Sequence, residues 1–282
     1  MSKRTHHPPP DTGRDRPPAR PRLAVLRPAS GARAVGLIGM LLTSVAHTHA
    51  GERRVVIGHD GRMPLEHAAA LGAGSAKRFA ATGQVECGGV RGIGQVTASA
   101  DVVTSAAHVF FDEAGRPRAA QGRCVFIVDG PEGRQTIPLT PSAQLCGSTS
   151  PYGVSGRHDW GAARLAHPIA GIRAYELGTR VKAGDPIAVV AFEGGRKTVD
   201  VCHVRDVVTT ETGARELRTD CVGFDGMSGA AYLTLDKTPK VLAVHVGFRS
   251  ADPGAVMVYS DRHYTFGAAI GQVLRRALAS AR

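Results

Sequence analysis

The stretch Asp220-Cys221-Val222-Gly223-Phe224-Asp225-Gly226-Met227-Ser228-Gly229 places a serine between two glycines, shortly after a cysteine. The small neighbours of Ser228 let the backbone bend sharply, which exposes the serine hydroxyl. The same bend directs the backbone N–H groups of Gly226 and Ser228 toward a point where negative charge could develop. Gly-x-Ser-Gly is also an ordinary turn, so its meaning depends on partners elsewhere in the chain.

Two upstream segments supply the partners that a serine nucleophile needs. The first is a β-branched run that ends in small residues and a histidine, Val102-Val103-Thr104-Ser105-Ala106-Ala107-His108-Val109. The second places an aspartate before an apolar run, His158-Asp159-Trp160-Gly161-Ala162-Ala163-Arg164-Leu165. An imidazole takes the serine proton and returns it to the leaving amine, and a buried carboxylate fixes the tautomer of the imidazole. The pattern predicts Ser228 as nucleophile, His108 as general base and acid, and Asp159 as the orienting carboxylate.

These three blocks resemble the motifs of trypsin-like (chymotrypsin-fold) serine proteases. Residues 104–109 are similar to their Thr-Ala-Ala-His motif, residues 159–165 to their Asp-Ile-Ala-Leu-Leu-x-Leu segment, and residues 226–229 to their Gly-Asp-Ser-Gly. The resemblance implies an all-β fold of two six-stranded antiparallel β-barrels with a C-terminal helix. It also implies that the first barrel carries His108 and Asp159, that the second carries Ser228, and that Gly226 and Ser228 form the oxyanion hole.

Departures from trypsin itself indicate the bacterial glutamyl-endopeptidase-like branch. Met227 occupies the position where trypsin has an aspartate that pairs with a new N-terminus, which makes the usual zymogen switch unexpected. Val56-Ile57-Gly58-His59-Asp60-Gly61-Arg62 resembles a Val-Ile-Gly-x-Asp-Asp-Arg segment near the mature start of that branch. Val244-His245-Val246-Gly247 resembles its Ile-His-x-Gly strand, which forms one wall of the primary specificity pocket.

This resemblance implies that His245 and Gly247 contact the substrate, together with Val222 at the position of the trypsin aspartate. A histidine can donate a hydrogen bond to a carboxylate, so a preference for acidic side chains is expected, whereas Val222 does not indicate a preference for Lys or Arg. The alternative is that His245 only fills a strand face beside the site.

The first fifty residues have the composition of a leader. Residues 1–30 are rich in proline and arginine, and an apolar run of thirteen residues, 34–46, follows. Such a run after a basic stretch indicates a signal peptide, with cleavage after Ala46 or Ala50, and an uncleaved anchor is the alternative. We therefore expect a leader at 1–50, an N-terminal barrel at 51–170 and a C-terminal barrel at 171–282, in a secreted or periplasmic protein without stable membrane association after cleavage.

The net charge and the cysteine content indicate which partners, metals and disulfides to expect. The leader carries a net +6 of the total +11, so the remainder is only mildly basic and nucleic-acid binding is not expected. We expect a polypeptide substrate, a monomer, and neither a cofactor nor a metal, because the cysteines are too dispersed for a zinc site. Export favours disulfides. The pattern favours a disulfide between Cys202 and Cys221 first and one between Cys124 and Cys146 second, which leaves Cys87 without a partner. The sequence alone does not decide the pairing.

The rest of the chain has a β-rich pattern. Short runs between Gly, Pro or Asp predict strands, at 95–97, 102–104, 124–128, 161–165, 187–192, 199–211, 216–220, 230–235, 241–246 and 255–259. An apolar stripe predicts one helix at 267–281.

Together these features predict a serine endopeptidase that acts through an acyl-enzyme. A catalytically inactive module of the same fold that only binds polypeptides is the first alternative, and the complete triad argues against it. An α/β-hydrolase is the second, and the order His, Asp, Ser argues against it, because that fold runs Ser, acid, His.

Overall fold

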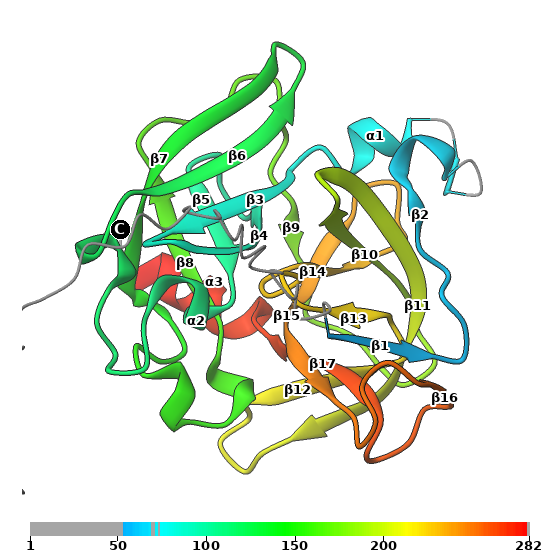
Figure 1. Ribbon diagram of the computed structural model, residues 1–282. Helices are drawn as coiled ribbons and strands as arrows, with labels where there is room; N and C mark the ends of the chain where they lie inside the picture. Colours follow the sequence, from blue (N-terminus) through cyan, green and yellow to red (C-terminus); the bar gives the residue numbers. More distant parts are fainter. Residues whose placement is uncertain (1–52, 69–70, 73, 281–282) are drawn as a thin grey trace, which may run out of the picture. The chain divides into compact units, whose positions relative to one another are not determined.

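Six strands of the first half of the chain close into a barrel in the computed structural model, which describes residues 53–68, 71–72 and 74–280 (Figure 1). The strands follow one another around the barrel in the order β3-β4-β5-β8-β7-β6, and every neighbouring pair is antiparallel. Their bounds are Thr82–Cys87 (β3), Val90–Val96 (β4), Val102–Ser105 (β5), Cys124–Gly130 (β6), Gly133–Cys146 (β7) and Gly161–Leu165 (β8). Val85, Val103 and Phe126 lie inside and are fully buried, so the barrel is filled by side chains.

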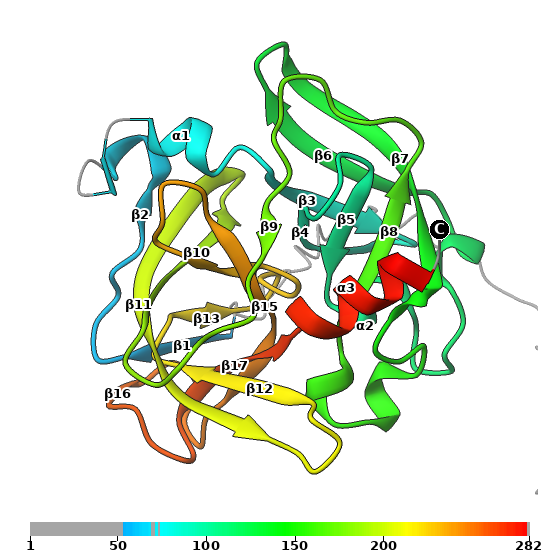
Figure 2. The same ribbon diagram turned by 180° about the vertical axis from the view of Figure 1, so that it is seen from behind.

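A second ring of six strands follows in the sequence. Strand β10 pairs with both β14 and β11, which closes the order β10-β14-β15-β17-β12-β11 (Figure 2). The bounds are Pro186–Glu193 (β10), Arg196–Thr209 (β11), Arg215–Thr219 (β12), Ala231–Thr234 (β14), Lys240–Arg249 (β15) and Tyr264–Ala269 (β17). The expected fold of two six-stranded antiparallel barrels is therefore confirmed, including a C-terminal helix, α3 (Gly271–Ser280).

The remaining elements are short. The strands are β1 (Arg54–Ile57), β2 (Met63–Pro64), β9 (Glu176–Leu177), β13 (Gly223–Phe224) and β16 (Val256–Met257). The helices are α1 (Ser75–Arg78), α2 (Ala107–Phe110) and the 3-10 turns η1 (Leu65–His67), η3 (Arg118–Ala120), η4 (Pro151–Gly153) and η5 (Gly156–His158). No helix of the described ranges is long and apolar enough to cross a membrane. The predicted leader and its cleavage positions lie outside the described residues.

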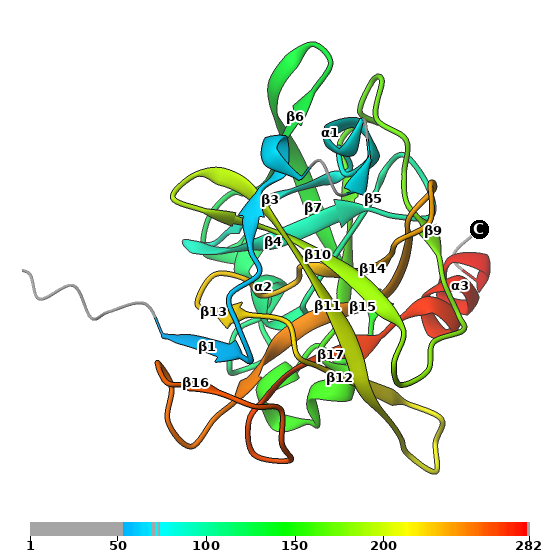
Figure 3. The ribbon, with the colours of Figure 1, turned by 90° about the vertical axis from the view of Figure 1, so that its right-hand side faces the viewer.

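The first described strands lie against the second barrel, although they precede the first barrel in sequence. β1 pairs with β13 and β16, and β2 pairs with β11 (Figure 3). The sequence-based division grouped these residues with the N-terminal barrel as part of 51–170. In the structure, β1 is the central strand of a three-stranded sheet with β13 and β16, and β2 pairs with β11 at the edge of the second barrel's sheet.

Several element boundaries differ from the prediction. The helix begins at Gly271 rather than at residue 267, because residues 264–269 form β17. β3 and β7 were not expected. The β7 sequence contains Pro138 and Pro141, which lack the N–H that a strand ladder uses, and this obscured a strand of 14 residues.

Two disulfides are present among the described residues. The bridge Cys202–Cys221 is confirmed. The pairing of Cys124 with Cys146 is wrong: Cys124 is bonded to Cys87, which lies directly opposite it on the neighbouring strand, with 4.0 Å between the Cα atoms. Cys146 is left as a half-buried free cysteine, because the register of β3 against β6 determines which thiols meet.

Loss of the Cys202–Cys221 bridge should destabilise the second barrel. The bridge closes a loop of 19 residues, which corresponds to about 3 kcal/mol of unfolding free energy. We expect the double variant Cys202→Ala/Cys221→Ala to lose about 2–4 kcal/mol in urea unfolding, whereas Cys146→Ser, the matched control, changes it by less than about 1 kcal/mol. Equal losses in the two variants would contradict the structural role of the bridge.

Lys197 connects the two barrels. It lies on β11, and its Nζ donates a hydrogen bond of 3.5 Å to the backbone oxygen of Phe79, which precedes the first barrel. Burial lowers the pKa of Lys197 to about 8, against the opposing effect of the Asp129 charge. The folded state therefore favours the neutral amine more than the unfolded chain does.

This shift predicts a stability change in alkaline solution. Between about pH 8 and pH 10.4 the unfolded chain holds a proton on Lys197 that the folded protein has released, so the free energy of unfolding should rise with pH. Below pH 8 both states are protonated and the contribution stays constant. Lys197→Met should remove a rise on the order of 1–3 kcal/mol in urea titrations at pH 8 and pH 10. An identical pH slope in both proteins would refute this assignment.

Candidate active site

His108 and Asp159 meet because their strands are neighbours. β5 pairs with β8 so that Ser105 lies opposite Gly161. His108 follows the end of β5, on the short helix α2, and Asp159 follows the 3-10 turn η5, two residues before β8 begins at Gly161. The two residues, 51 positions apart in sequence, are thereby brought to the same end of the first barrel.

The carboxylate of Asp159 binds His108 twice. Its Oδ1 accepts the backbone N–H of His108 at 2.9 Å, and its Oδ2 lies 2.6 Å from the ring Nδ1. Asp159 is only 5 % exposed. An ionised carboxylate can only accept hydrogen bonds, so this contact favours the tautomer in which Nδ1 is the donor. The structure therefore brings together two of the three residues that the sequence singled out, with the carboxylate of Asp159 on Nδ1 of His108.

The backbone of His108 is also fixed from the other side. Arg118 Nε donates to the backbone oxygen of His108 at 3.1 Å. The ring of Tyr152, which is 54 % exposed, lies with its centroid 6.1 Å from that of the imidazole. One edge of the histidine thus faces an exposed aromatic side chain.

Ser228 lies on a turn that is bonded to both barrels. Its carbonyl oxygen accepts the N–H of Ile93 from β4 of the first barrel at 2.8 Å. The next residue, Gly229, donates its N–H to the backbone oxygen of His245 in the second barrel, also at 2.8 Å. The turn begins directly after β13, where Asp225 exchanges hydrogen bonds with Arg53 of the first described segment.

Gly229 permits this close approach. Its φ is +86°, and a Cβ there would collide with Ser105 Oγ and Ile93 O and lie 2.8 Å from Ala106 N. Ala106 lies two residues before His108, so the Ser228 turn packs against the chain that carries the histidine. No hydrogen bond joins Ser228 Oγ to His108 among the described residues. Catalytic hydrogen bonds of this kind are often long until substrate binds.

The two predicted oxyanion donors are unoccupied within the described part of the chain. Neither the N–H of Gly226 nor that of Ser228 donates a hydrogen bond to any described residue. Gly226 is exposed and Ser228 is half-buried. Both N–H groups are therefore without a hydrogen-bond acceptor among the described residues.

His245 lies beside this turn and deep in the second barrel. It is 1 % exposed, and its Nδ1 is 3.0 Å from the hydroxyl of Tyr232 on β14. Burial, and secondarily the charge of His108, lowers the pKa of His245 to about 3. The ring is therefore neutral at physiological pH.

The other two predicted substrate-binding residues differ in their setting. Val222 is buried in the core, and its N–H donates to Asp200 Oδ2 at 2.8 Å. Gly247 lies opposite Phe266 of β17, just after an irregularity in the β15–β17 pairing. Sequence reasoning missed Asp200, whose pKa is raised by burial, and Tyr232; neither lies in a motif, so only the strand register brings them to the site.

One cluster has metal-like composition. The ligand atoms of Asp200, Cys202 and Cys221 all lie within 4.8 Å of one another. The two sulfurs are joined in a disulfide, so they cannot act as thiolate ligands. Asp200 and Cys202 on β11 instead connect that strand to Val222 and Cys221, a few residues before Ser228.

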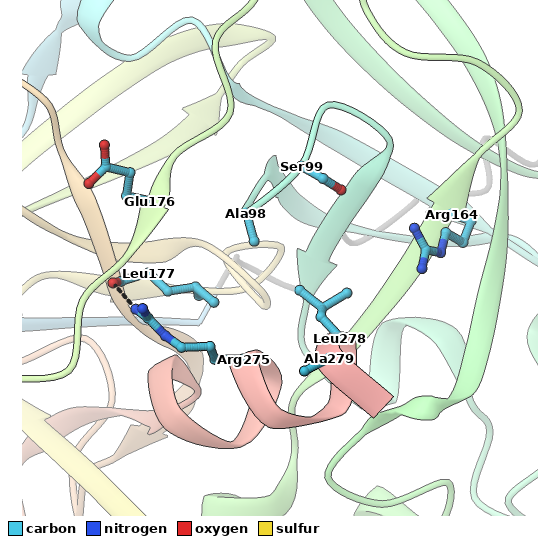
Figure 4. Close-up of a pocket in the computed structure, with 8 residues that line it drawn as sticks. All are labelled: Ala98, Ser99, Arg164, Glu176, Leu177, Arg275, Leu278 and Ala279. Atoms are coloured by element: carbon cyan, nitrogen blue, oxygen red, sulfur yellow. Dashed lines mark hydrogen bonds between the residues drawn. The ribbon is translucent and has the colours of Figure 1, made fainter. Parts of the chain in front are cut away.

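A cavity of about 670 Å³ lies apart from these residues (Figure 4). It is lined by the turn after β4, by β8 and β9, and by α3, and Arg275 on its wall donates to the backbone oxygen of Leu177 at 2.8 Å. Neither His108 nor Ser228 lines it.

Comparison with solved structures identifies the same fold. A Glu endopeptidase in complex with MPD superposes with a TM-score of 0.57 at 15% identity, covering 80% of this chain and 99% of that one. A thermostable serine protease, AL20, from an extremophilic microorganism gives 0.52 at 16%, covering 73% and 98%. The HtrA-type protease AlgW with a tripeptide gives 0.51 at 14%, covering 73% and 61%.

No family model matches the sequence, and no curated protein matches it. The structural likeness at these identities establishes a fold similar to that of chymotrypsin-fold serine proteases. What this chain does depends on its own site residues.

Proposed function

We propose that the protein is a serine endopeptidase that hydrolyses peptide bonds through an acyl-enzyme. The observation that carries the proposal is the pairing of His108 with the buried Asp159, 2.6 Å apart, next to a turn that presents Ser228. The fold similarity to serine proteases supports it. The polypeptide substrate would lie across the two barrels, where the Ser228 turn contacts β4.

The first step forms the acyl-enzyme. Ser228 Oγ attacks the scissile carbonyl while Nε2 of His108 takes the hydroxyl proton. The N–H groups of Gly226 and Ser228 stabilise the resulting oxyanion. Collapse of the intermediate breaks the C–N bond, and the imidazolium returns its proton to the leaving amine.

Water completes the cycle. It attacks the ester carbonyl while His108 takes one of its protons, and Ser228 leaves with that proton, which regenerates the free enzyme and releases the acid. Asp159 stays ionised throughout and stabilises the imidazolium.

The alternative function is polypeptide binding without catalysis. The observation that favours it is that Ser228 Oγ makes no hydrogen bond to His108 among the described residues. In that case the same surface would hold an extended chain but leave it intact.

Labelling with a fluorophosphonate decides between the two functions. This reagent phosphonylates an activated serine, so we expect the wild-type protein to be labelled and Ser228→Ala to be unlabelled. Ser142→Ala, which removes a half-buried serine on β7, is the matched control and should label like the wild type. A folded wild type that resists labelling would favour the binding module, and labelling of Ser228→Ala would remove Ser228 as nucleophile.

We also propose that the protein belongs to the glutamyl-endopeptidase-like branch, that it is exported with removal of the leader after Ala46 or Ala50, and that it acts as a monomer. The apolar run of the leader and the two disulfides support export. The acidic preference is a separate hypothesis, because it depends on the state of His245.

A further inference from the structure

We propose that the cavity between β8, β9 and α3 is a second ligand site, which binds a carboxylate joined to an aliphatic chain. The site is separate from the proposed active site, because neither His108 nor Ser228 lines the cavity. Its volume of about 670 Å³ lies within the range of about 300–1,000 Å³ that is usual for small-molecule sites. The side chains on its walls indicate what kind of molecule would fill it.

Arg275 supplies a cation that no described carboxylate neutralises. It lies on α3, and its Nη2 donates to the backbone oxygen of Leu177 at 2.8 Å. The ion pairs among the described residues involve other arginines. A guanidinium has five N–H groups, and those that do not bond Leu177 can donate to an anion in the cavity.

The other two ionisable residues on the wall already have partners of opposite charge. Arg164 on β8 donates from Nη1 to Asp101, which does not line the cavity, at 2.8 Å. Glu176 on β9 pairs with Arg173 at 3.3 Å. The positive charge of Arg275 is therefore the one that remains uncompensated on the described wall. This balance favours a ligand with a single negative charge.

The rest of the wall favours an aliphatic group. The remaining lining residues are Ala98, Ser99, Leu177, Leu278 and Ala279. In the view of Figure 4, Leu278 lies between Arg275 and Arg164, so a ligand bound at Arg275 would extend along aliphatic side chains. Each methylene that is buried there should tighten binding by up to about fourfold. A carboxylate with an alkyl chain therefore fits better than a small inorganic anion.

The backbone of Ala98 also points to a ligand site. Its φ is +66°, and it is the one non-glycine residue with a positive φ in the described part of the chain. The Ala98 N–H donates to the backbone oxygen of Tyr175 at 2.8 Å, which helps to hold this conformation. Residues with a Cβ rarely adopt a positive φ, and those that do cluster at functional sites. Here the conformation places Ala98 on the cavity wall (Figure 4).

Isothermal titration calorimetry of the purified protein with octanoate tests the proposal. We expect a Kd below about 1 mM. Octan-1-ol, which lacks the charge, and butanoate, which lacks four methylenes, should each bind about tenfold more weakly or worse. The peptide Ala-Ala-Leu with a free C-terminus, compared with its C-terminal amide, distinguishes the source of the carboxylate. Tighter binding of the peptide acid than of octanoate would identify a peptide end as the ligand, and the reverse order would identify an alkanoate.

Three variants that each remove one charge locate the binding. Arg275→Gln should weaken octanoate binding by about tenfold, because a hydrogen bond to an ionised group is lost. Glu176→Gln should tighten it by about two- to threefold, because a negative charge leaves the wall. Arg276→Gln is the matched control, since Arg276 is also exposed on α3 but does not line the cavity, and its Kd should equal that of the wild type.

Three results would overturn the proposal. The first is that the wild type binds neither octanoate nor the peptide acid, and the second is that octan-1-ol binds as tightly as octanoate. The third is an equal Kd for Arg275→Gln and Arg276→Gln. If Arg275→Gln does not fold, an octanoate affinity that is unchanged in Glu176→Gln has the same meaning, because unfolding cannot imitate tighter binding.

Discussion

Under the proposed function, we expect the replacement of Asp159 by asparagine to lower kcat by about 10⁴-fold, as the equivalent change does in a serine protease with this triad. In the wild type, Oδ1 accepts the His108 N–H and Oδ2 faces Nδ1. An asparagine that keeps the first bond turns its NH₂ toward Nδ1, so this nitrogen must accept and the proton moves to Nε2. The ring then has no lone pair for the Ser228 proton. The measurement is kcat on a peptide substrate.

The matched control is Asp101→Asn. Asp101, in the turn between β4 and β5, is also a carboxylate of the first barrel, and it pairs at 2.8 Å with Arg164, which lines the separate cavity. We expect its kcat to stay within about twofold of the wild type. If Asp159→Asn melts like the wild type and keeps more than one-tenth of its kcat, Asp159 does not set the histidine tautomer.

Replacing Gly229 by alanine should remove both stability and activity. The positive φ of +86° costs a residue with a Cβ about 1–2 kcal/mol, and the collision with Ser105 and Ile93 adds about 1–3 kcal/mol of overpacking. The turn can relieve this only by moving away from β4, which carries Ser228 away from His108. We expect a loss of about 2–5 kcal/mol in urea unfolding and no detectable fluorophosphonate labelling.

Gly195→Ala separates the two causes. Gly195 has a similar φ of +80° at the tip of the β10–β11 hairpin, but nothing lies within 4 Å of a Cβ there. We expect this control to lose only about 1–2 kcal/mol and to label normally. Equal losses of unfolding free energy in the two variants would show that the close approach at Gly229 does not contribute to stability.

The core of the site could be predicted from the sequence because its chemistry depends on short local patterns. The serine turn, the histidine after a β-branched run and the aspartate before a strand are each contained within a few residues. Both barrels and the pairing of Cys202 with Cys221 were also expected and were confirmed. The fluorophosphonate labelling experiment tests whether Ser228, His108 and Asp159 act together.

What the sequence could not supply depends on register. Cys87 meets Cys124 only because β3 and β6 align at those residues. Tyr232 reaches His245 only because β14 and β15 pair side by side, and this contact, invisible in the sequence, changes the expected chemistry of the histidine. The prediction assigned the last residues of β17 to the C-terminal helix, because Gly267, Ala268 and Ala269 lack the β-branched side chains that indicate a strand.

The pairing of β1 with β13 decides how the chain can be divided into working pieces. Arg54 lies opposite Phe224, so a strand from the start of the described chain pairs with the segment just before the Ser228 turn. A cut at residue 170 would leave that strand on the wrong half. In a fragment complementation experiment with separately expressed halves, residues 53–64 should therefore be fused to the C-terminal half. A C-terminal half that starts at residue 171 should assemble only when a peptide of residues 53–64 is added.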